Sequence, residues 1–409
     1  MKKRIVAALM SAVLVGTILA GCGGGSGASA SNDTQSQPAA QEAPAAGTAE
    51  GTSEGTAEGT ATSSAPADNP FAGITAKENY DLQIIVKAYS STYWQALMQG
   101  CNDAAAELGV TVTNQGPNNE SDVADQVNMF NTAINNSPAG IGIASCDADS
   151  CTDSLKQAKS AGVPIVAFDS GFPNAPEGTV LATIATDSYA AGQIAGEEMW
   201  KAIRDKVMNS ETPCRVGYVG QDTVSGSQQG RGLGFIDALY AAAAADGVTA
   251  GVTGNDYFAG NAKEKGDAAS AKLIIEARIP SQATADFCSA EATALLNQPD
   301  ITGIFSSGQM STEAISAADN NLGKFATSAE EGVIAIGFDA GAQTKADIAG
   351  GKIYGAITQA PYLMGYYTVY ALTAAANGET DKVVDYDCPA VFYNAENMND
   401  PEIATNLYD

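Results

Sequence analysis

A regular alternation of short apolar runs and longer amphipathic stretches, which starts near Asp81, most constrains the fold of this chain. The run "LQIIVKAY" precedes "YWQALMQGCNDAAAELG", and the same order recurs in "GIGIAS", "CTDSLKQAKSAG" and "PIVAFDSGF". Near-continuous apolar strands separated by helices are typical of βαβ units, whose parallel sheet is covered on both faces. The rhythm restarts with "CRVGYVGQ" and continues to "KIYGAITQ". The sequence therefore predicts an α/β fold with two similar, doubly wound Rossmann-like lobes.

The two predicted lobes echo each other at the end of one strand. Residues 165–172 read "IVAFDSGF" and residues 335–341 read "AIGFDAG". Ligands of open parallel sheets bind beyond the carboxyl ends of the strands, so Asp169 and Asp339 would face one cleft from opposite sides. For either aspartate alone, capping a helix or shaping a turn is an alternative. The matched pair favours the cleft.

The N-terminus has the pattern of an export signal. "MKKR" precedes an apolar run that ends in "LAGC", which predicts a signal peptide over residues 1–21. Cys22 then matches a lipobox, whose cysteine is lipidated and anchors the mature protein outside the cytoplasm. A spanning helix is the alternative, but the apolar run is shorter than the roughly 20 residues that a bilayer needs. Residues 22–79 are rich in small and polar residues, which predicts a disordered tether after the lipidated Cys22.

Charge and composition exclude several classes of function. The 47 acidic and 20 basic residues give a net charge of −27, which argues against nucleic-acid or anionic-lipid partners. The chain has no histidine, so Ser-His-Asp and Cys-His mechanisms are excluded. No cofactor is expected.

Six cysteines remain once Cys22 is assigned to the anchor. They lie in a compartment where disulfides persist, and their pairing cannot be chosen from sequence. Disulfides, free thiols and a metal cluster around "CDADSC" stay open, although paired zinc-type spacings are absent and no metal is expected. The six are Cys101, Cys146, Cys151, Cys214, Cys288 and Cys388.

From about residue 81 to 381, the chain resembles the type I periplasmic binding proteins of sugar ABC importers, especially the ribose-binding branch. The markers are "SSTYWQALMQG", "GVPIVAFDSGF", "ATIATDSYAAGQIAG", "DITGIFSSGQMSTEAISA", "VIAIGFDAG" and "GAITQAPYLMGY". The resemblance implies two lobes joined by a three-stranded hinge, with passages near Thr186–Asp187, Ala340–Gly341 and Gln359–Pro361. The implied lobes are residues 80–186 plus 361–381, and residues 187–360 plus 382–409.

The resemblance also implies a set of ligand contacts. A carboxylate accepts hydrogen bonds from adjacent sugar hydroxyls, and arginine supplies a rigid fork of donors. Tyr93 and Trp94 would cover the apolar face of a sugar, with a role as core residues at a helix start as the alternative. The implied contacts are Ser91, Tyr93, Trp94, Ser145, Asp169, Thr186, Arg231, Tyr257, Gly308 or Gln309, Phe338, Asp339 and Gln359.

The chain departs from the ribose-binding pattern at several of these positions. Ser170 stands where relatives have arginine, and Ser91, Ser145 and Gly308 replace asparagines of the cleft. "GPNNESDVADQ" and "FDSGF" also resemble the branch that binds the furanosyl signal autoinducer-2. "GSQQGRGLGF" lacks the spacing of a phosphate loop, and we interpret it as the segment that delivers Arg231.

The function implied is that of a monomeric, lipid-anchored receptor that captures a pentose or hexose and delivers it to an ABC permease. The alternative is a sugar or autoinducer-2 receptor that serves a membrane signalling partner. An enzyme would need Asp169 and Asp339 to act as a glycosidase pair, yet nothing in the sequence marks one as acid and the other as nucleophile. We therefore expect a binding protein, and the sequence does not choose among the sugars.

Overall fold

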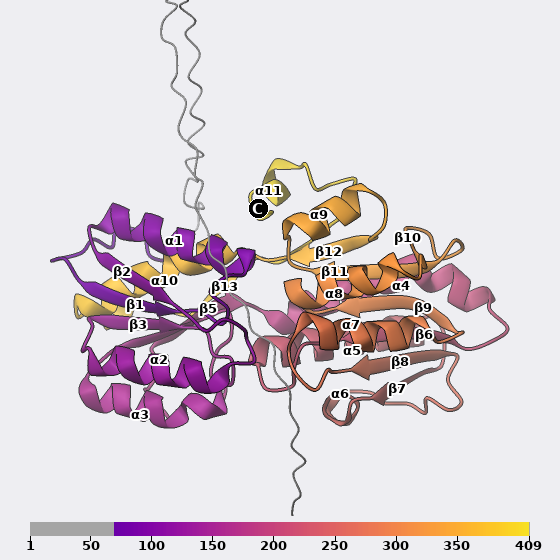
Figure 1. Cartoon of the computed structure of the whole chain (residues 1–409), viewed down its shortest axis with the longest axis horizontal. Helices are drawn as coiled ribbons and strands as arrows, with labels where there is room; N and C mark the ends of the chain where they lie inside the picture. Colours follow the sequence, from indigo (N-terminus) through magenta and orange to yellow (C-terminus); the bar gives the residue numbers. More distant parts are fainter. Residues whose placement is uncertain (1–68, 409) are drawn as a thin grey trace, which may run out of the picture. The chain divides into compact units, whose positions relative to one another are not determined.

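Two sheets organise residues 69–408, the part of the chain that this computed structural model describes (Figure 1). The first sheet has six strands in the order β13-β5-β4-β3-β1-β2. The second has eight, in the order β14-β12-β11-β9-β6-β8-β7 with β10 beside β11. Among the strand ladders of the described residues, only β12 with β14 is antiparallel. This arrangement confirms the predicted fold of two doubly wound α/β lobes.

The first lobe places two helices on each face of its sheet. Alternate strand residues face opposite sides, so Ile84 packs with α1 and α10 while Ile85 packs with α2 and α3. Its elements are β1 (Asp81–Ile85), α1 (Thr92–Leu108), β2 (Thr111–Gln115), α2 (Val123–Asn135), β3 (Gly140–Ile143), η1 (Asp149–Cys151), α3 (Thr152–Ala161), β4 (Ile165–Phe168), β5 (Ala182–Thr186), α10 (Pro361–Ala376), η2 (Thr380–Lys382) and β13 (Tyr386–Cys388).

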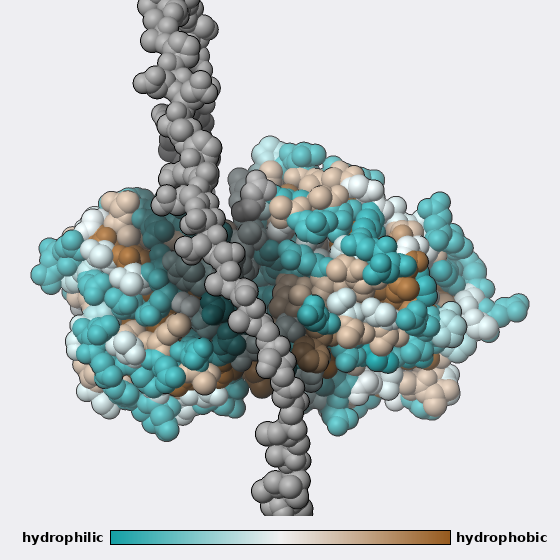
Figure 2. All heavy atoms as spheres, viewed as in Figure 1, coloured by the Kyte–Doolittle hydropathy of each residue, from teal (hydrophilic) through white to brown (hydrophobic). Residues whose placement is uncertain are grey.

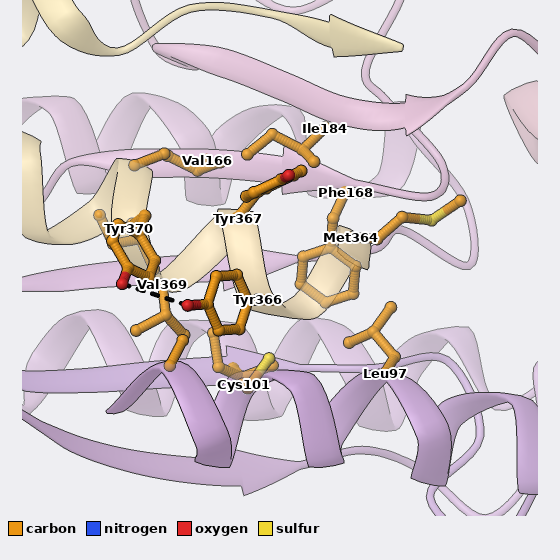
Figure 3. Packing of buried hydrophobic residues seen from close by; sticks show 14 of the residues in the cluster. Leu97, Cys101, Val166, Phe168, Ile184, Met364, Tyr366, Tyr367, Val369 and Tyr370 are labelled. Atoms are coloured by element: carbon orange, nitrogen blue, oxygen red, sulfur yellow. Dashed lines mark hydrogen bonds between the residues drawn. The ribbon is translucent and has the colours of Figure 1, made fainter. Parts of the chain in front are cut away.

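Helices α1 and α10 pack closely because each has a glycine at the contact. A Cβ atom on Gly100 would lie 2.0 Å from the carbonyl oxygen of Tyr362, and one on Gly365 would lie 2.0 Å from that of Leu97. Figure 3 shows Leu97 and Cys101 of α1 on one side of α10, and Phe168 and Ile184 of the sheet beyond it. This packing positions the first turn of α1, which carries Tyr93 and Trp94.

The second lobe has the same layering. Helices α4 and α5 cover one face of its sheet, and α7 and α8 cover the other. Its elements are α4 (Ser188–Asn209), β6 (Cys214–Val219), α5 (Gly226–Ala245), β7 (Ala250–Gly254), α6 (Asp256–Asn261), β8 (Leu273–Arg278), α7 (Ala285–Leu296), β9 (Ile301–Ser306), α8 (Gln309–Asn320), β10 (Phe325–Ala326), β11 (Val333–Phe338), α9 (Ala342–Ala349), β12 (Gly355–Thr358), β14 (Val391–Tyr393) and α11 (Pro401–Ala404).

The chain passes between the two sheets three times. Asp187 connects β5 to α4, residues 359–360 connect β12 to α10, and residues 389–390 connect β13 to β14. The passage predicted near Ala340–Gly341 is wrong, because β11 and α9 both belong to the second lobe. Residues 386–388 pair with β5 and so belong to the first sheet, although 382–409 was assigned to the second lobe. Three residues are too few to produce a recognisable strand pattern.

The folded part also begins earlier than predicted. Phe71 is fully buried and lies 5.6 Å from Tyr367 between ring centroids, and Ile74 is buried in the same core. Residues 69–79 therefore pack on the first lobe, whereas they had been assigned to the tether. The predicted signal peptide, Cys22 and the rest of the tether lie outside the described residues.

The cysteines of the described part are all buried free thiols. Cys146 and Cys151, the nearest pair in sequence, are not joined to each other. Burial raises the pKa of Cys151 to about 12, so its thiol stays protonated at neutral pH. Of the alternatives that the sequence left open, the structure shows free thiols.

In the view of Figure 2, many hydrophilic residues lie on the surface of both lobes, with hydrophobic residues between them. Within residues 69–408, the longest helices are too short or too polar to span a bilayer.

Candidate ligand-binding site

A cavity of about 390 Å³ lies where strand ends of the two sheets meet. The first lobe contributes the segment after β1, the loop around Glu120, and Asp169 after β4. The second lobe contributes Arg231 from α5, Gln309 from the start of α8, and Asp339 after β11. Ligands of parallel α/β sheets bind at such strand ends.

Asp169 and Asp339 have matching backbone geometry. Their φ angles are 54° and 73°, and Ser137 is the only other non-glycine residue of the described chain with a positive φ. The backbone N–H group of each aspartate continues the hydrogen-bond ladder to the neighbouring strand. Asp169 donates to the carbonyl oxygen of Ile184, and Asp339 donates to that of Ile357. Left-handed backbone at a non-glycine residue costs on the order of 1–3 kcal/mol and concentrates at functional sites.

Neither aspartate caps the element that follows it. β5 follows Asp169 with no helix between them, and α9 starts at Ala342 after Gly341, which has no side chain to cap it. Asp339 does accept the backbone N–H of Gln309, 2.9 Å away, at the start of α8. Helix capping thus accounts for one contact of Asp339, at α8 rather than at α9, but not for the placement of Asp169.

Asp169 is held as a carboxylate. The Tyr93 hydroxyl donates to its Oδ2 at 2.8 Å, and the Ser170 hydroxyl donates to its Oδ1 at 3.0 Å. Burial favours the neutral acid, but Lys87 and then Arg231 more than compensate, so the pKa of Asp169 lies below its usual value. The Arg231 contact crosses from the second lobe, with Nη2 3.7 Å from Oδ2.

Lys87 is the main site residue that the sequence analysis missed. Its Nζ lies 3.4 Å from Asp169 and 3.7 Å from Glu120, and it donates to the hydroxyls of Ser170 and Ser225. Burial opposes the charge, yet Glu120 and Asp169 raise the pKa of Lys87 above its usual value. A lysine directly after an apolar strand, at the same edge as Asp169, was the available signal.

Asp339 is in a different electrostatic environment. Gln359 donates to its Oδ1 at 2.6 Å, and burial raises the pKa of Asp339 to about 6 although Arg231 opposes this. Asp169 is thus ionised at every physiological pH, whereas Asp339 takes up a proton near pH 6.

Arg231 connects the two halves of the site. Its guanidinium donates to the Ser307 carbonyl and to Gln359, each at 2.9 Å, and lies 4.1 Å from the ring centroid of Phe338. Within residues 69–408, the buried Nε–H of Arg231 has no hydrogen-bond partner.

Tyr93 and Trp94 are both core residues and part of the cavity wall. Their exposed fractions are 4% and 2%, and their rings meet edge to face at 4.9 Å. The Trp94 indole N–H donates to Glu120 at 3.1 Å. Burial agrees with the alternative that they are core residues, and their contact with a sugar stays a prediction.

The other predicted contacts divide into two groups. Ser91, Gln309 and Gln359 line the cavity together with the residues already described. The structure does not place Ser145, Thr186, Tyr257, Gly308 or Phe338 on its wall. Phe338 lies beneath Arg231, and Tyr257 packs on Phe258. Gln221 and Gln228, which line the cavity, were also missed.

The two lobes contact each other directly beside the cavity. The Ser170 hydroxyl lies 2.9 Å from that of Ser227, and Gln309 Nε2 donates to the Thr92 hydroxyl at 2.7 Å. The lobes are therefore closed on the cavity in this structure.

Comparison with known protein families identifies the family of this two-lobed chain. The model of the periplasmic binding protein domain matches residues 82–380. The chain belongs to the periplasmic binding protein family. The match agrees with the resemblance to the ribose-binding branch, and the chain is a binding protein rather than an enzyme.

Solved structures resemble this periplasmic binding protein over most of its length. An ABC transporter solute-binding protein from Agrobacterium vitis with bound D-fucose is 28% identical, with a TM-score of 0.67 over 80% of this chain and 100% of that chain. A carbohydrate transporter solute-binding protein from Agrobacterium radiobacter, in complex with D-arabinose, is 25% identical, with a TM-score of 0.66 over 81% and 100%.

Proposed function

We propose that this periplasmic binding protein captures a monosaccharide, a pentose or hexose, in the cleft between its lobes. The observation that carries the proposal is the pair Asp169 and Asp339, which occupy matched strand ends and line one cavity from opposite lobes. Each carboxylate can accept hydrogen bonds from two neighbouring sugar hydroxyls. Arg231 adds a cationic guanidinium to the cavity wall, and Trp94 adds an aromatic ring.

The size and charge of the cavity suit a small neutral ligand. Its volume of about 390 Å³ lies at the lower end of the range for ligand pockets, roughly 300–1,000 Å³. Two cationic and four acidic side chains line it, so a phosphorylated sugar would meet net repulsion. They are Lys87 and Arg231, and Glu120, Asp169, Glu313 and Asp339. The sugars bound by the two solved relatives, D-fucose and D-arabinose, support the same class.

Lipidated at Cys22, the receptor acts as a monomer outside the cytoplasm and delivers its sugar to an ABC permease. The three passages between the sheets form the hinge about which the lobes close. The description of the Agrobacterium vitis protein as an ABC transporter solute-binding protein supports the permease as the partner.

The alternative ligand is autoinducer-2, read by a membrane signalling partner. One observation favours it: Asn118, Asn119 and Glu120, from the segment that resembles that branch, line the cavity. Glu120 also contacts Lys87 and Trp94, so this segment contributes to the polar wall.

A thermal-shift screen tests the proposal, because a ligand that binds only the native state raises its melting temperature. The probes are D-fucose, D-arabinose, other pentoses and hexoses, their phosphates, polyols, nucleosides and autoinducer-2. Calorimetry then measures the affinity of each hit. A shift with autoinducer-2 and with none of the sugars would establish the alternative, and a preference for sugar phosphates would contradict both.

A further inference from the structure

Residues 394–408 run from β14 back to the boundary between the lobes, beyond the segment that the family model matches. Ile403 and Leu407 pack on the buried core of the second lobe, and α11 lies beside α9 in Figure 1. The Thr358 hydroxyl donates to the carbonyl oxygen of Asn406 at 2.7 Å. The tail is therefore attached at the end of β12, directly before the passage at residues 359–360.

Tyr408 extends from this tail to both lobes. Its hydroxyl accepts the backbone N–H of Ala340 at 3.2 Å and donates to Gln309 Oε1 at 3.3 Å, both in the second lobe. Its ring meets that of Tyr93, in the first lobe, edge to face at 5.9 Å. Tyr408 itself is not part of the cavity wall.

Each partner of Tyr408 contacts one of the cleft aspartates. Tyr93 donates to Asp169, the backbone N–H of Gln309 donates to Asp339, and Ala340 directly follows Asp339. Tyr408 is thus one contact away from both carboxylates.

The hydroxyl of Tyr408 also determines the orientation of the Gln309 amide. Because this hydroxyl donates to Oε1, the Nε2 group faces the other way, where it donates to Thr92 of the first lobe at 2.7 Å and to Glu313. Loss of the hydroxyl would free the amide to turn, and the bond between the lobes would weaken.

We propose that the C-terminal tail, residues 394–408, is a clasp whose Tyr408 holds the cleft in its closed, ligand-binding arrangement. Tyr408 is a positioning residue that increases sugar affinity without touching the sugar. The affinity measurement below rests on the proposed function. The clasp itself lies outside residues 82–380, which the family model matches.

The test compares full-length wild type with Tyr408→Phe, which removes one hydroxyl, and Tyr408→Ala, which also removes the ring. Tyr354→Phe is the control, because Tyr354 is a second-lobe tyrosine that packs on Phe392 and does not line the cavity. Calorimetry and stopped-flow dissociation are measured with D-fucose, D-arabinose and autoinducer-2.

We expect Tyr408→Phe, which loses both hydrogen bonds of the hydroxyl, to weaken binding about three- to tenfold, mainly through faster dissociation. Tyr408→Ala should weaken it further. The melting temperature without ligand should barely change for Tyr408→Phe, because Ile403, Leu407 and Asn406 still hold the tail. Unchanged affinity in both variants would overturn the clasp.

Hydrogen exchange of the ligand-free chain gives a second, independent readout. A clasp predicts faster exchange in Tyr408→Ala at residues 339–341 and also at residues 91–95 of the first lobe. A role confined to packing the tail would change only residues 339–341 and the tail, which would overturn the proposal. If wild type bound none of the probes, the proposed function would fail, and this exchange experiment would still decide the clasp.

Discussion

The Lys87 ammonium lies 3.4 Å from the Asp169 carboxylate, and the exposed fraction of each side chain is 3%. Removal of one partner from a buried pair leaves the other charge uncompensated, which typically costs about 3–5 kcal/mol of stability. The same pair of residues therefore lines the cavity and contributes to the stability of the fold.

The Lys87→Met variant should lose stability of that magnitude, since Asp169 and Glu120 lose their nearest cation. Urea denaturation measures the free energy of unfolding. The control is Lys156→Met, whose exposed pair with Asp153 should contribute no more than about 1 kcal/mol. Addition of Asp169→Asn to Lys87→Met should cost less than the sum of the single changes, and full additivity would show that the two groups are not coupled.

Asp339 should produce a distinct pH dependence of stability. Its pKa rises from 3.8 in the unfolded chain to about 6 in the folded one because of burial. Its contribution to stability is fully present below about pH 4 and is lost as the pH rises through 6. Relative to Asp339→Asn, wild type should lose free energy of unfolding between pH 4 and 6.5. A constant difference between the two proteins over this range would contradict the raised pKa.

The contribution of Asp169 to stability should have the opposite pH dependence to that of Asp339, over a lower pH range. Because its pKa is lowered, its stabilising contribution is present above the unfolded value of 3.8 and is lost as the pH falls below it. The contributions of the two carboxylates can therefore be separated in one titration.

Sugar affinity should depend on both aspartates. We expect Asp169→Ala and Asp339→Ala each to weaken binding about tenfold or more, because a hydrogen bond to a charged group contributes roughly 1.5–3 kcal/mol. Calorimetry with D-fucose and D-arabinose measures the change. Ser145→Ala is the control, because Ser145 does not line the cavity. Unchanged affinity in either aspartate variant would exclude that residue from the binding site.

Ligand should shift the population of lobe arrangements towards closure. The contacts from Ser170 to Ser227 and from Gln309 to Thr92 form only when the lobes meet, and each connects a residue of one lobe to the other. Small-angle scattering should give a smaller radius of gyration with saturating sugar than without it. An identical radius, under conditions where melting confirms binding, would mean that the cleft is closed before the ligand arrives.

The proposed anchor is tested at Cys22. Cys22→Ala should abolish lipid modification and release the protein from the membrane fraction, while the melting temperature of the folded part stays the same. Intact-mass analysis of membrane-bound wild type decides the matter, since an unmodified Cys22 there would refute the anchor.

The two lobes and the two cleft aspartates could be predicted from the sequence alone. Periodicity is local, so the apolar strands and amphipathic helices can be recognised from neighbouring residues alone. The echo at Asp169 and Asp339 was visible because both follow long apolar strands in the same way. Arg231, Gln309 and Gln359 were predicted from the resemblance, and the structure places them on the cavity wall.

The other residues that meet at the cavity could be identified only from the folded structure. Lys87 looks like an ordinary charged end of a strand, and its burial depends on Glu120 and Asp169, which are distant in sequence. The strand β13 has three residues and forms only because β5 offers an edge, so the third passage could not be placed from its own sequence. Tyr408 lies between the lobes because Thr358 and the second-lobe core hold the tail. Such contacts join segments that are far apart in the sequence, and no local pattern encodes them.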